Sequence, residues 1–356
     1  MPSLKEIKGR INSISSTLAI TSAMKMVAAA KLQKAQMAIQ NMLPYERRLY
    51  SMLVDLMGAM NISAAASEDG SVRGSGSAER GFDQSGDRLS LSNRHDLAGM
   101  DGAYSLMAQR EVRKVAIVAF ASNSSLCGAF NSNVIREATA VINEYRASGL
   151  GDADITVYSV GRKMAEAMKK LGFPSPADFT KMSDSPSYDA ASALAQELFD
   201  GFVSGRFDKV ELVYNHYKST SSQPTTRQTY LPLSLADATA DIQVGKITDS
   251  VSEPYADKVA EPVVRQNSPT TETPDLIVEP SKEELIVTLL PKVVRLRVFT
   301  TLLDSTAAEQ AARTVAMQLA TDNGNDLLQE LTLEYNKGRQ QKITSEILDL
   351  VGGSMQ

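Results

Sequence analysis

The chain has 356 residues, 43% of them apolar, and a formal net charge of −5. This length and composition exclude a wholly disordered chain and predict two or three structural units. Residues 1–7 lack the apolar core and cleavage site of a signal peptide, and no apolar run reaches the roughly eighteen residues that suggest a membrane span. We therefore expect an intracellular protein with no direct membrane insertion.

Few residues suit metal or redox chemistry. Cys127 is the single cysteine, which excludes an internal disulfide, and His95 and His216 are the two histidines. We expect no metal site and no cofactor. A sequence pI near 5.3 argues against nucleic acid as a general partner, because phosphate binding needs a basic face. The charge is uneven, however: residues 1–50 hold eight Lys or Arg against two acids, so this end could meet an anionic partner.

The first unit, residues 1–62, reads as one long helix. Its apolar residues recur at helical spacing, at Leu4, Ile7, Ile11, Ile14 and Leu18, then at Ile20, Met24, Val27, Ala28, Leu32, Ala35 and Ile39. Pro44 should bend the helix without ending it. Residues 4–60 would form a rod of roughly 85 Å at about 1.5 Å per residue, and its apolar stripe needs an equally long partner.

The last unit, residues 281–356, supplies that partner. Ser281 and Glu284 form a capping box, Pro291 should kink the helix, and Gly352 and Gly353 should end it. The predicted apolar stripe is Ala308, Ala312, Val315, Leu319, Leu327, Leu331, Ile343, Ile347 and Leu350. Small residues crowd its early part, which permits close approach of another backbone. We expect the two ends to form a two-helix coiled coil, either parallel or antiparallel.

Three segments lie between these helices. Residues 63–110 are rich in Gly and Ser and predict a flexible insertion. Residues 111–232 alternate strands at 114–121, 155–160, 210–214 and 226–231 with helices at 133–148, 163–171 and 188–203, which is typical of an α/β sheet with helical crossovers. Residues 233–280 carry several prolines and predict an irregular connection with one short strand at 276–278.

No motif predicts an active site or catalytic residues. Cys127 follows a strand, but neither histidine stands in a motif that would pair with it, so a small buried thiol is the favoured interpretation. The turn Val160–Lys163 links a strand to a helix, where backbone amides could hold a phosphate, yet it lacks the known phosphate-binding glycine patterns. Residues 336–346 form a polar run that interrupts the apolar stripe all round the helix, which favours contact with a polar partner.

Both ends resemble the gamma subunit of F-type ATP synthases. The resemblance covers about 120 residues and rests on Leu4–Ile11, Ile20–Leu32, Leu126–Asn131, Ala308–Arg313, Ala320–Asn323, Tyr335–Gln340 and Ile343–Glu346. It implies an antiparallel left-handed coiled coil of the two terminal helices, with a central Rossmann-like α/β domain. The chain departs from the family pattern at Ser124 and Ser125, where Arg-Gly is usual, so it lacks that arginine.

The resemblance implies a non-catalytic rotor shaft, with chemistry left to the beta subunits. Its expected partners are the alpha and beta subunits of the catalytic ring, the epsilon subunit and the membrane c-ring. The expected location is the cytoplasmic side of a bacterial inner membrane, as a peripheral protein. The residues expected to contact the ring are Met24, Lys25, Lys31, Arg339, Gln340, Thr344 and Glu346.

Two alternatives stay open on the sequence. The chain could be a coiled-coil scaffold protein, in which case the polar run near Arg339 would tolerate substitution. Its α/β domain could also bind a nucleotide and act as an enzyme, in which case the isolated chain would bind ATP or NAD.

Overall fold

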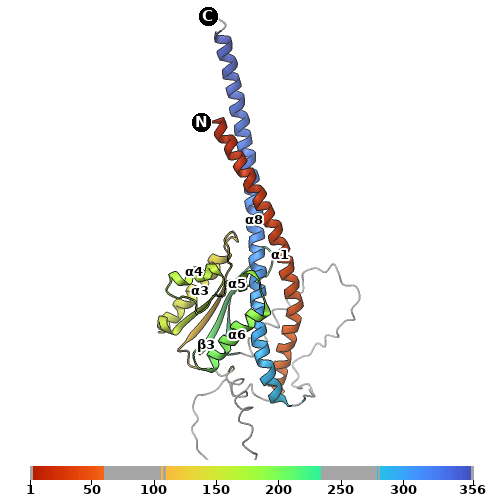
Figure 1. Ribbon diagram of the computed structural model, residues 1–356, viewed down its shortest axis with the longest axis vertical. Helices are drawn as coiled ribbons and strands as arrows, with labels where there is room; N and C mark the ends of the chain where they lie inside the picture. Colours follow the sequence, from red (N-terminus) through yellow and green to blue (C-terminus); the bar gives the residue numbers. More distant parts are fainter. Residues whose placement is uncertain (1–2, 60–105, 107–109, 234–278, 280, 354–356) are drawn as a thin grey trace, which may run out of the picture.

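Two long helices dominate the molecule, and an α/β domain packs against the lower half of the pair (Figure 1). The computed structural model describes residues 3–59, 106, 110–233, 279 and 281–353. Helix α1 spans Leu4–Ala59 and helix α8 spans Lys282–Gly353. Except for Leu106 and Arg110, the predicted insertion 63–110 lies outside the described residues, and so does the predicted strand at 276–278.

The two helices run antiparallel, which decides the direction that their periodicity left open. Thr321 Oγ1 donates a hydrogen bond to Thr21 Oγ1 at 3.0 Å, near the middle of the pair. Towards the N-terminus of α1, Leu4 lies against Gly338. Both termini therefore lie at the same end of the molecule, and α8 continues past the start of α1 (Figure 1).

Burial on α1 follows a seven-residue repeat over its first five repeats. The buried or half-buried seam positions are Leu4, Ile7, Ile11, Ile14, Leu18, Thr21, Lys25, Ala28, Leu32 and Ala35. The predicted stripe was wrong at Ile20 and Val27, which are 60% and 57% exposed. The seam keeps its spacing and accepts the polar Thr21 and Lys25 instead, because the position relative to α8, and not hydrophobicity, decides which side chains are covered.

The predicted stripe of α8 needs a similar correction. Ala308 and Leu331 are buried as expected, and Ala307 and Ala311 pack on Leu32 and Ala35 of α1. Six other predicted positions face solvent or lack a neighbouring helix: Val315, Leu319, Leu327, Ile343, Ile347 and Leu350. Helical spacing alone therefore located the seam only in part.

Both predicted helix prolines lie inside continuous helices, Pro44 in α1 and Pro291 in α8. The Ser281 side of the predicted capping box is confirmed, since Ser281 Oγ accepts from Glu284 N at 3.2 Å. Buried side chains flank Pro291, and this packing offsets the lost backbone hydrogen bond, whereas the residues next to Pro44 are half-buried or exposed.

The central domain is a four-stranded sheet with helices on both faces. Its elements are β1 (Val115–Phe120), α3 (Phe130–Ala147), η3 (Asp152–Asp154), β2 (Ile155–Val160), α4 (Arg162–Lys170), α5 (Thr180–Asp184), α6 (Tyr188–Val203), β3 (Lys209–Asn215) and β4 (Thr225–Leu231). The strand order is β2-β1-β3-β4; β1 pairs in parallel with β2 and β3, and β4 runs antiparallel to β3. The predicted α/β alternation is confirmed, and only the short α5 and η3 were not foreseen.

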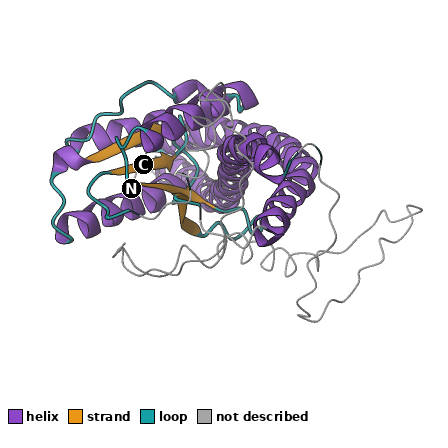
Figure 2. Ribbon diagram, turned by 90° about the horizontal axis from the view of Figure 1, so that it is seen from below, coloured by secondary structure: helices purple, strands orange, loops and turns teal. Residues whose placement is uncertain are grey.

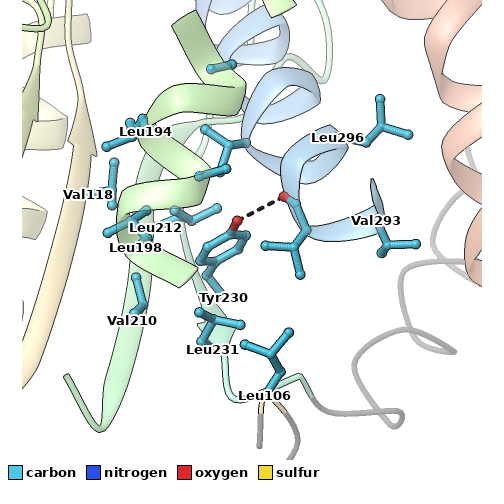
Figure 3. Close-up of a cluster of buried hydrophobic side chains, with 14 of the residues drawn as sticks. Leu106, Val118, Leu194, Leu198, Val210, Leu212, Tyr230, Leu231, Val293 and Leu296 are labelled. Atoms are coloured by element: carbon cyan, nitrogen blue, oxygen red, sulfur yellow. Dashed lines mark hydrogen bonds between the residues drawn. The ribbon is translucent and has the colours of Figure 1, made fainter. Parts of the chain in front are cut away.

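Helix α8 belongs to the shaft and to the domain core at once. Helices α3 and α4 cover one face of the sheet, and α6 and α8 cover the other (Figure 2). Tyr230 Oη of β4 donates to the backbone oxygen of Val294 at 2.9 Å beside side chains of β1, β3 and α6, whereas Val293 and Leu296 lie on the side of α8 that faces α1 (Figure 3). A shared core of this size joins the sheet and the shaft into one body.

Candidate functional site

The predicted partner-contact residues fall into two groups at different heights on the shaft. Met24, Lys25 and Lys31 lie in the middle of α1, whereas Arg339 and its neighbours lie beyond the first turn of α1. In this register Lys25 and Arg339 are separated by roughly 30 Å along the shaft, at about 1.5 Å per residue. The structure therefore does not bring them together into one site.

The end of α8 is a free helix with mixed character. Every side chain from residue 339 to residue 348 is exposed, including Arg339, Gln340, Thr344 and Glu346. Thr344 Oγ1 donates to Gln340 O at 2.9 Å, and Lys342 pairs with Glu346 at 3.7 Å. Apolar side chains share this surface, with Ile343, Ile347 and Leu350 all exposed. A surface of both kinds in a segment without a helical partner is suited to binding another protein.

The three predicted contact residues of α1 interact with α8 of the same chain more than the sequence suggests. Met24 and Lys25 are half-buried, and Lys25 occupies a seam position facing α8. Lys31 is exposed, but its charge acts on Glu309 of α8: burial raises the pKa of the Glu309 carboxyl, while Arg313 and then Lys31 oppose that rise. The neighbouring Met26 and Val27 point to solvent.

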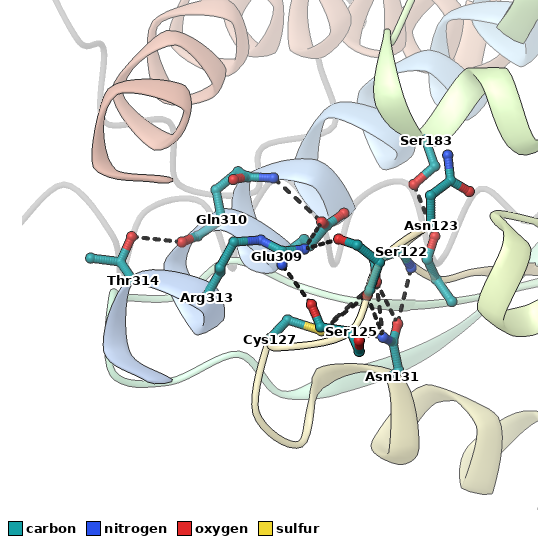
Figure 4. A network of polar contacts seen from close by, with 12 residues as sticks. Ser122, Asn123, Ser125, Cys127, Asn131, Ser183, Glu309, Gln310, Arg313 and Thr314 are labelled. Carbon is teal, nitrogen blue, oxygen red and sulfur yellow. Dashed lines mark hydrogen bonds and ion pairs between the residues drawn. The ribbon is translucent and has the colours of Figure 1, made fainter. Parts of the chain in front are cut away.

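A buried polar network that the sequence did not reveal joins α8 to the domain (Figure 4). Arg313 donates to the backbone oxygen of Ser125 at 2.7 Å and to Ser124 Oγ at 2.8 Å, and it pairs with Glu309. The two serines receive the guanidinium through one backbone oxygen and one hydroxyl. Arg313 carried a signal only as part of the Ala308–Arg313 motif, because its serine partners lie almost 190 residues away.

Asn131 holds the loop after β1, to which Arg313 binds. Asn131 Oδ1 accepts from the backbone amide of Ser122 at 3.0 Å, and Asn131 Nδ2 lies 3.2 Å from Cys127 Sγ. Cys127 is 1% exposed and packs on Phe130 and Ala308. The prediction of a small buried thiol is thereby confirmed.

The β3–β4 hairpin reaches both shaft helices. Asp304 of α8 accepts from the backbone amide of Tyr217 at 2.9 Å and lies 2.6 Å from His216 Nδ1. Gln36 of α1 donates to Tyr217 Oη at 2.6 Å. One hairpin therefore links α1, α8 and the sheet.

The possible phosphate turn is already filled by protein groups. Asn123 Oδ1 accepts from Arg162 N at 2.7 Å, and Ser122 O accepts from Lys163 N at 3.2 Å. Gly161 has a φ of 97°, and a Cβ there would lie 2.0 Å from Ala121 O, so this glycine serves a close backbone approach. Sheets of this type bind ligands at the carboxyl ends of their parallel strands. Here α8 contacts the segments that follow those ends, through Asp304 to His216 and through Arg313 to Ser125.

One hollow of about 290 Å³ lies at the β2 edge, away from the shaft. Its charged lining mixes Lys114 and Arg206 with Asp154 and Glu197, and Tyr158 Oη donates to Glu197 at 3.0 Å. Burial, followed by the charge of Glu197, raises the pKa of Tyr158. The mixed lining shows no excess of positive charge for a nucleotide.

Among the described residues, no cluster of three or more His, Cys, Asp or Glu side chains is arranged to hold a metal ion. In the same part of the chain, no helix has the length and apolarity to cross a membrane.

Comparison with known proteins identifies the family of this chain. The family model described as ATP synthase matches residues 3–355. The ATP synthase gamma chain of Phocaeicola vulgatus is 47% identical and that of Bacteroides thetaiotaomicron 44% identical, each over 100% of both chains. A chain in the cryo-EM structure of the Euglena gracilis mitochondrial ATP synthase, OSCP/F1/c-ring in rotational state 3, is 18% identical with a TM-score of 0.53, covering 99% of this chain and 93% of that one, and shares its fold. The chain therefore belongs to the ATP synthase gamma chain family.

Proposed function

We propose that this chain is the central rotor shaft of an F-type ATP synthase. Rotation of the ion-driven c-ring turns the α/β domain, the shaft turns with it, and the uneven shaft surface drives the catalytic beta subunits through their conformations. The observation that carries this proposal is the antiparallel helix pair. At its lower end the pair shares one core with the α/β domain, and at its other end α8 extends alone beyond α1.

In this proposal the helix pair winds as a left-handed coiled coil. The seam on α1 alternates steps of three and four residues, and a strict seven-residue repeat supercoils two helices to the left. A wound pair resists twisting better than two separate helices, because each helix blocks the rotation of the other. This property suits a part that carries torque.

Torque then enters the shaft where the domain holds it. The shared core, the Arg313 network and the Tyr217 hairpin all contact α8 between residues 286 and 313, and Gln36 extends the connection to α1. These contacts keep the domain from turning around the shaft. The chain itself performs no bond chemistry; it supplies contact energy that differs between states of the beta subunits.

The free end of α8 and the middle of α1 are the proposed contacts with the ring of alpha and beta subunits. Arg339, Gln340, Thr344 and Glu346 would make polar contacts inside the ring, and Met24, Lys25 and Lys31 would lie beside the moving parts of beta. The epsilon subunit and the c-ring would bind the α/β domain. The complex would place this chain at the cytoplasmic side of the bacterial inner membrane, as a peripheral protein.

The test is reconstitution with the alpha and beta subunits of the same complex. We expect the three chains to co-purify, and a bead fixed to the α/β domain to rotate when ATP is added. Co-purification without ATP-driven rotation would support a scaffold instead, and no assembly at all would contradict both. Calorimetric titration of the isolated chain with ATP and with NAD should be flat, since α8 fills the sheet edge where such ligands bind.

A further inference from the structure

Two leucines of α1 each lie against a glycine of α8. A Cβ placed on Gly324 would be 2.7 Å from Leu18 Cδ2, and a Cβ placed on Gly338 would be 3.1 Å from Leu4 Cδ2. Both glycines lie inside a helix, where glycine is less favourable than alanine. Their missing side chains therefore act as two notches, and each notch receives one leucine.

The two notches are spaced identically on both helices. Leu4 and Leu18 are fourteen residues apart, as are Gly324 and Gly338, which equals two seven-residue repeats. Thr321 then bonds to Thr21 three residues further along each helix, in the same alignment. All three contacts agree on a single axial position of α1 against α8.

Most other seam residues do not select that position. A slip of one seven-residue repeat would keep Ile7, Ile11 and Ile14 on the seam, opposite other seam residues of α8. The same slip would place Leu18 opposite Leu331 or Met317, where large side chains replace the notch. Overpacking of this kind is unfavourable in a closely packed seam.

We propose that the Leu4–Gly338 and Leu18–Gly324 notches set the axial register of the helix pair and so fix how much of α8 projects beyond α1. A slip of one repeat would change that projection by roughly 10 Å, at about 1.5 Å per residue. The register is a property of the chain alone. Only its consequence, the height of Arg339 and Thr344 relative to the ring, rests on the proposed function.

Cysteine crosslinking of the purified full-length chain tests this register. Cys127→Ser removes the single cysteine. Thr21→Cys is then combined with Thr321→Cys for the native register, or with Thr314→Cys or Leu328→Cys for a slip of one repeat in either direction. In the parent we expect rapid disulfide formation for the 21/321 pair, and yields lower by at least about fivefold for the two slipped pairs.

Filling the notch should then move the crosslink. Gly324→Leu should lower the yield of the 21/321 pair at least about fivefold, and exchanging the partners with Leu18→Ala and Gly324→Leu together should restore it. Gly324→Ala should have little effect, because the end of Leu18 can shift. Unchanged crosslinking in Gly324→Leu would overturn the proposal. If that variant does not fold, the exchanged double variant decides, and failure of that variant to form the 21/321 disulfide would also overturn it.

The assembled complex separates this inference from the rotor proposal. Suppose that the variants change the register of the isolated chain but do not affect ATP-driven rotation. The notches would then still set the register, but their proposed role in positioning the end of α8 would be wrong.

Discussion

The two ends of α8 are one continuous helix in opposite surroundings. Near its start the helix packs against both α1 and the sheet, so Ile286, Leu290 and Val298 are almost fully buried. From about residue 320 only α1 remains beside it, and after Gly338 it has no neighbouring helix within the described chain. The number of packed neighbours thus falls from two to one to none. Stability should depend on the first part and partner binding on the last.

The largest effect expected is at the junction. Arg313→Ala leaves the Glu309 carboxylate buried without its guanidinium and removes two hydrogen bonds to the loop after β1. We expect a loss of about 3–5 kcal/mol in the free energy of unfolding, measured by urea denaturation. Lys342→Ala, which breaks an exposed pair on the same helix, is the control and should change it by about 0–1 kcal/mol.

Replacing one leucine by alanine at each end of α8 tests the difference between the packed start and the free end of the helix. Leu290→Ala opens a cavity in the shared core, because Leu290 is 0% exposed, and should cost about 2–5 kcal/mol. Leu348→Ala, at 65% exposure, should stay within about 0.5 kcal/mol of the parent. Equal losses in the two variants, measured by the same denaturation, would contradict the assignment of core and free end.

A smaller effect should follow from Tyr217→Phe. The ring keeps its packing, but the bond from Gln36 Nε2 is lost, so we expect a decrease of about 0.5–1.5 kcal/mol in unfolding free energy. Hydrogen exchange of the α1 amides around Gln36 should rise as well. Faster exchange confined to the β3–β4 hairpin would show that the hairpin does not hold α1.

Two buried glutamates should respond to pH in opposite directions. Burial raises the pKa of Glu309, so its favourable contribution is present below its unfolded pKa near 4.5 and is lost as the pH rises through the folded value. Burial also opposes ionisation of Glu211, yet hydrogen bonds from Arg227, Lys209 and Tyr145 outweigh it and lower the pKa. Its contribution is present above pH 4.5 and is lost as the pH falls through the folded value.

Denaturation of the Glu309→Gln and Glu211→Gln variants across this pH range measures the difference. The stability of the parent relative to Glu309→Gln should decrease as the pH rises above 4.5. Relative to Glu211→Gln it should decrease as the pH falls below 4.5. Slopes of the same sign would show that the Arg313 pair and the Glu211 cluster are electrostatically alike.

The smallest effect on stability is expected at the free end. Arg339→Ala should leave the unfolding free energy within about 0.5 kcal/mol, because the side chain is exposed and no part of α1 lies beside it. In the reconstituted complex we expect ATP-driven ion pumping to fall more than ATP hydrolysis. Full pumping with this substitution would favour the scaffold alternative, and unfolding would show that the end is not free.

Local patterns were sufficient for the elements themselves. The helix at 188–203 and the strand at 155–160 were predicted to the residue, and the cap at Ser281 was recognised from its spacing to Glu284. These features depend on neighbours within a few residues, so the sequence holds all the information. The motifs of the two ends likewise indicated the family, since they are runs of adjacent residues.

What only the tertiary structure decided was which neighbours these elements meet. Periodicity placed Ile20 on the seam and left the helix direction open, because several faces of a helix are apolar enough to bury. The antiparallel register chose Thr21, and the same register left Arg339 beyond the end of α1. Arg313 donates hydrogen bonds to Ser124 and Ser125, which lie almost 190 residues away in the sequence. The sequence by itself determined the two long helices and the sheet between them. Contacts between residues so far apart in the sequence depend on the tertiary fold, and the local spacing of residues does not specify them.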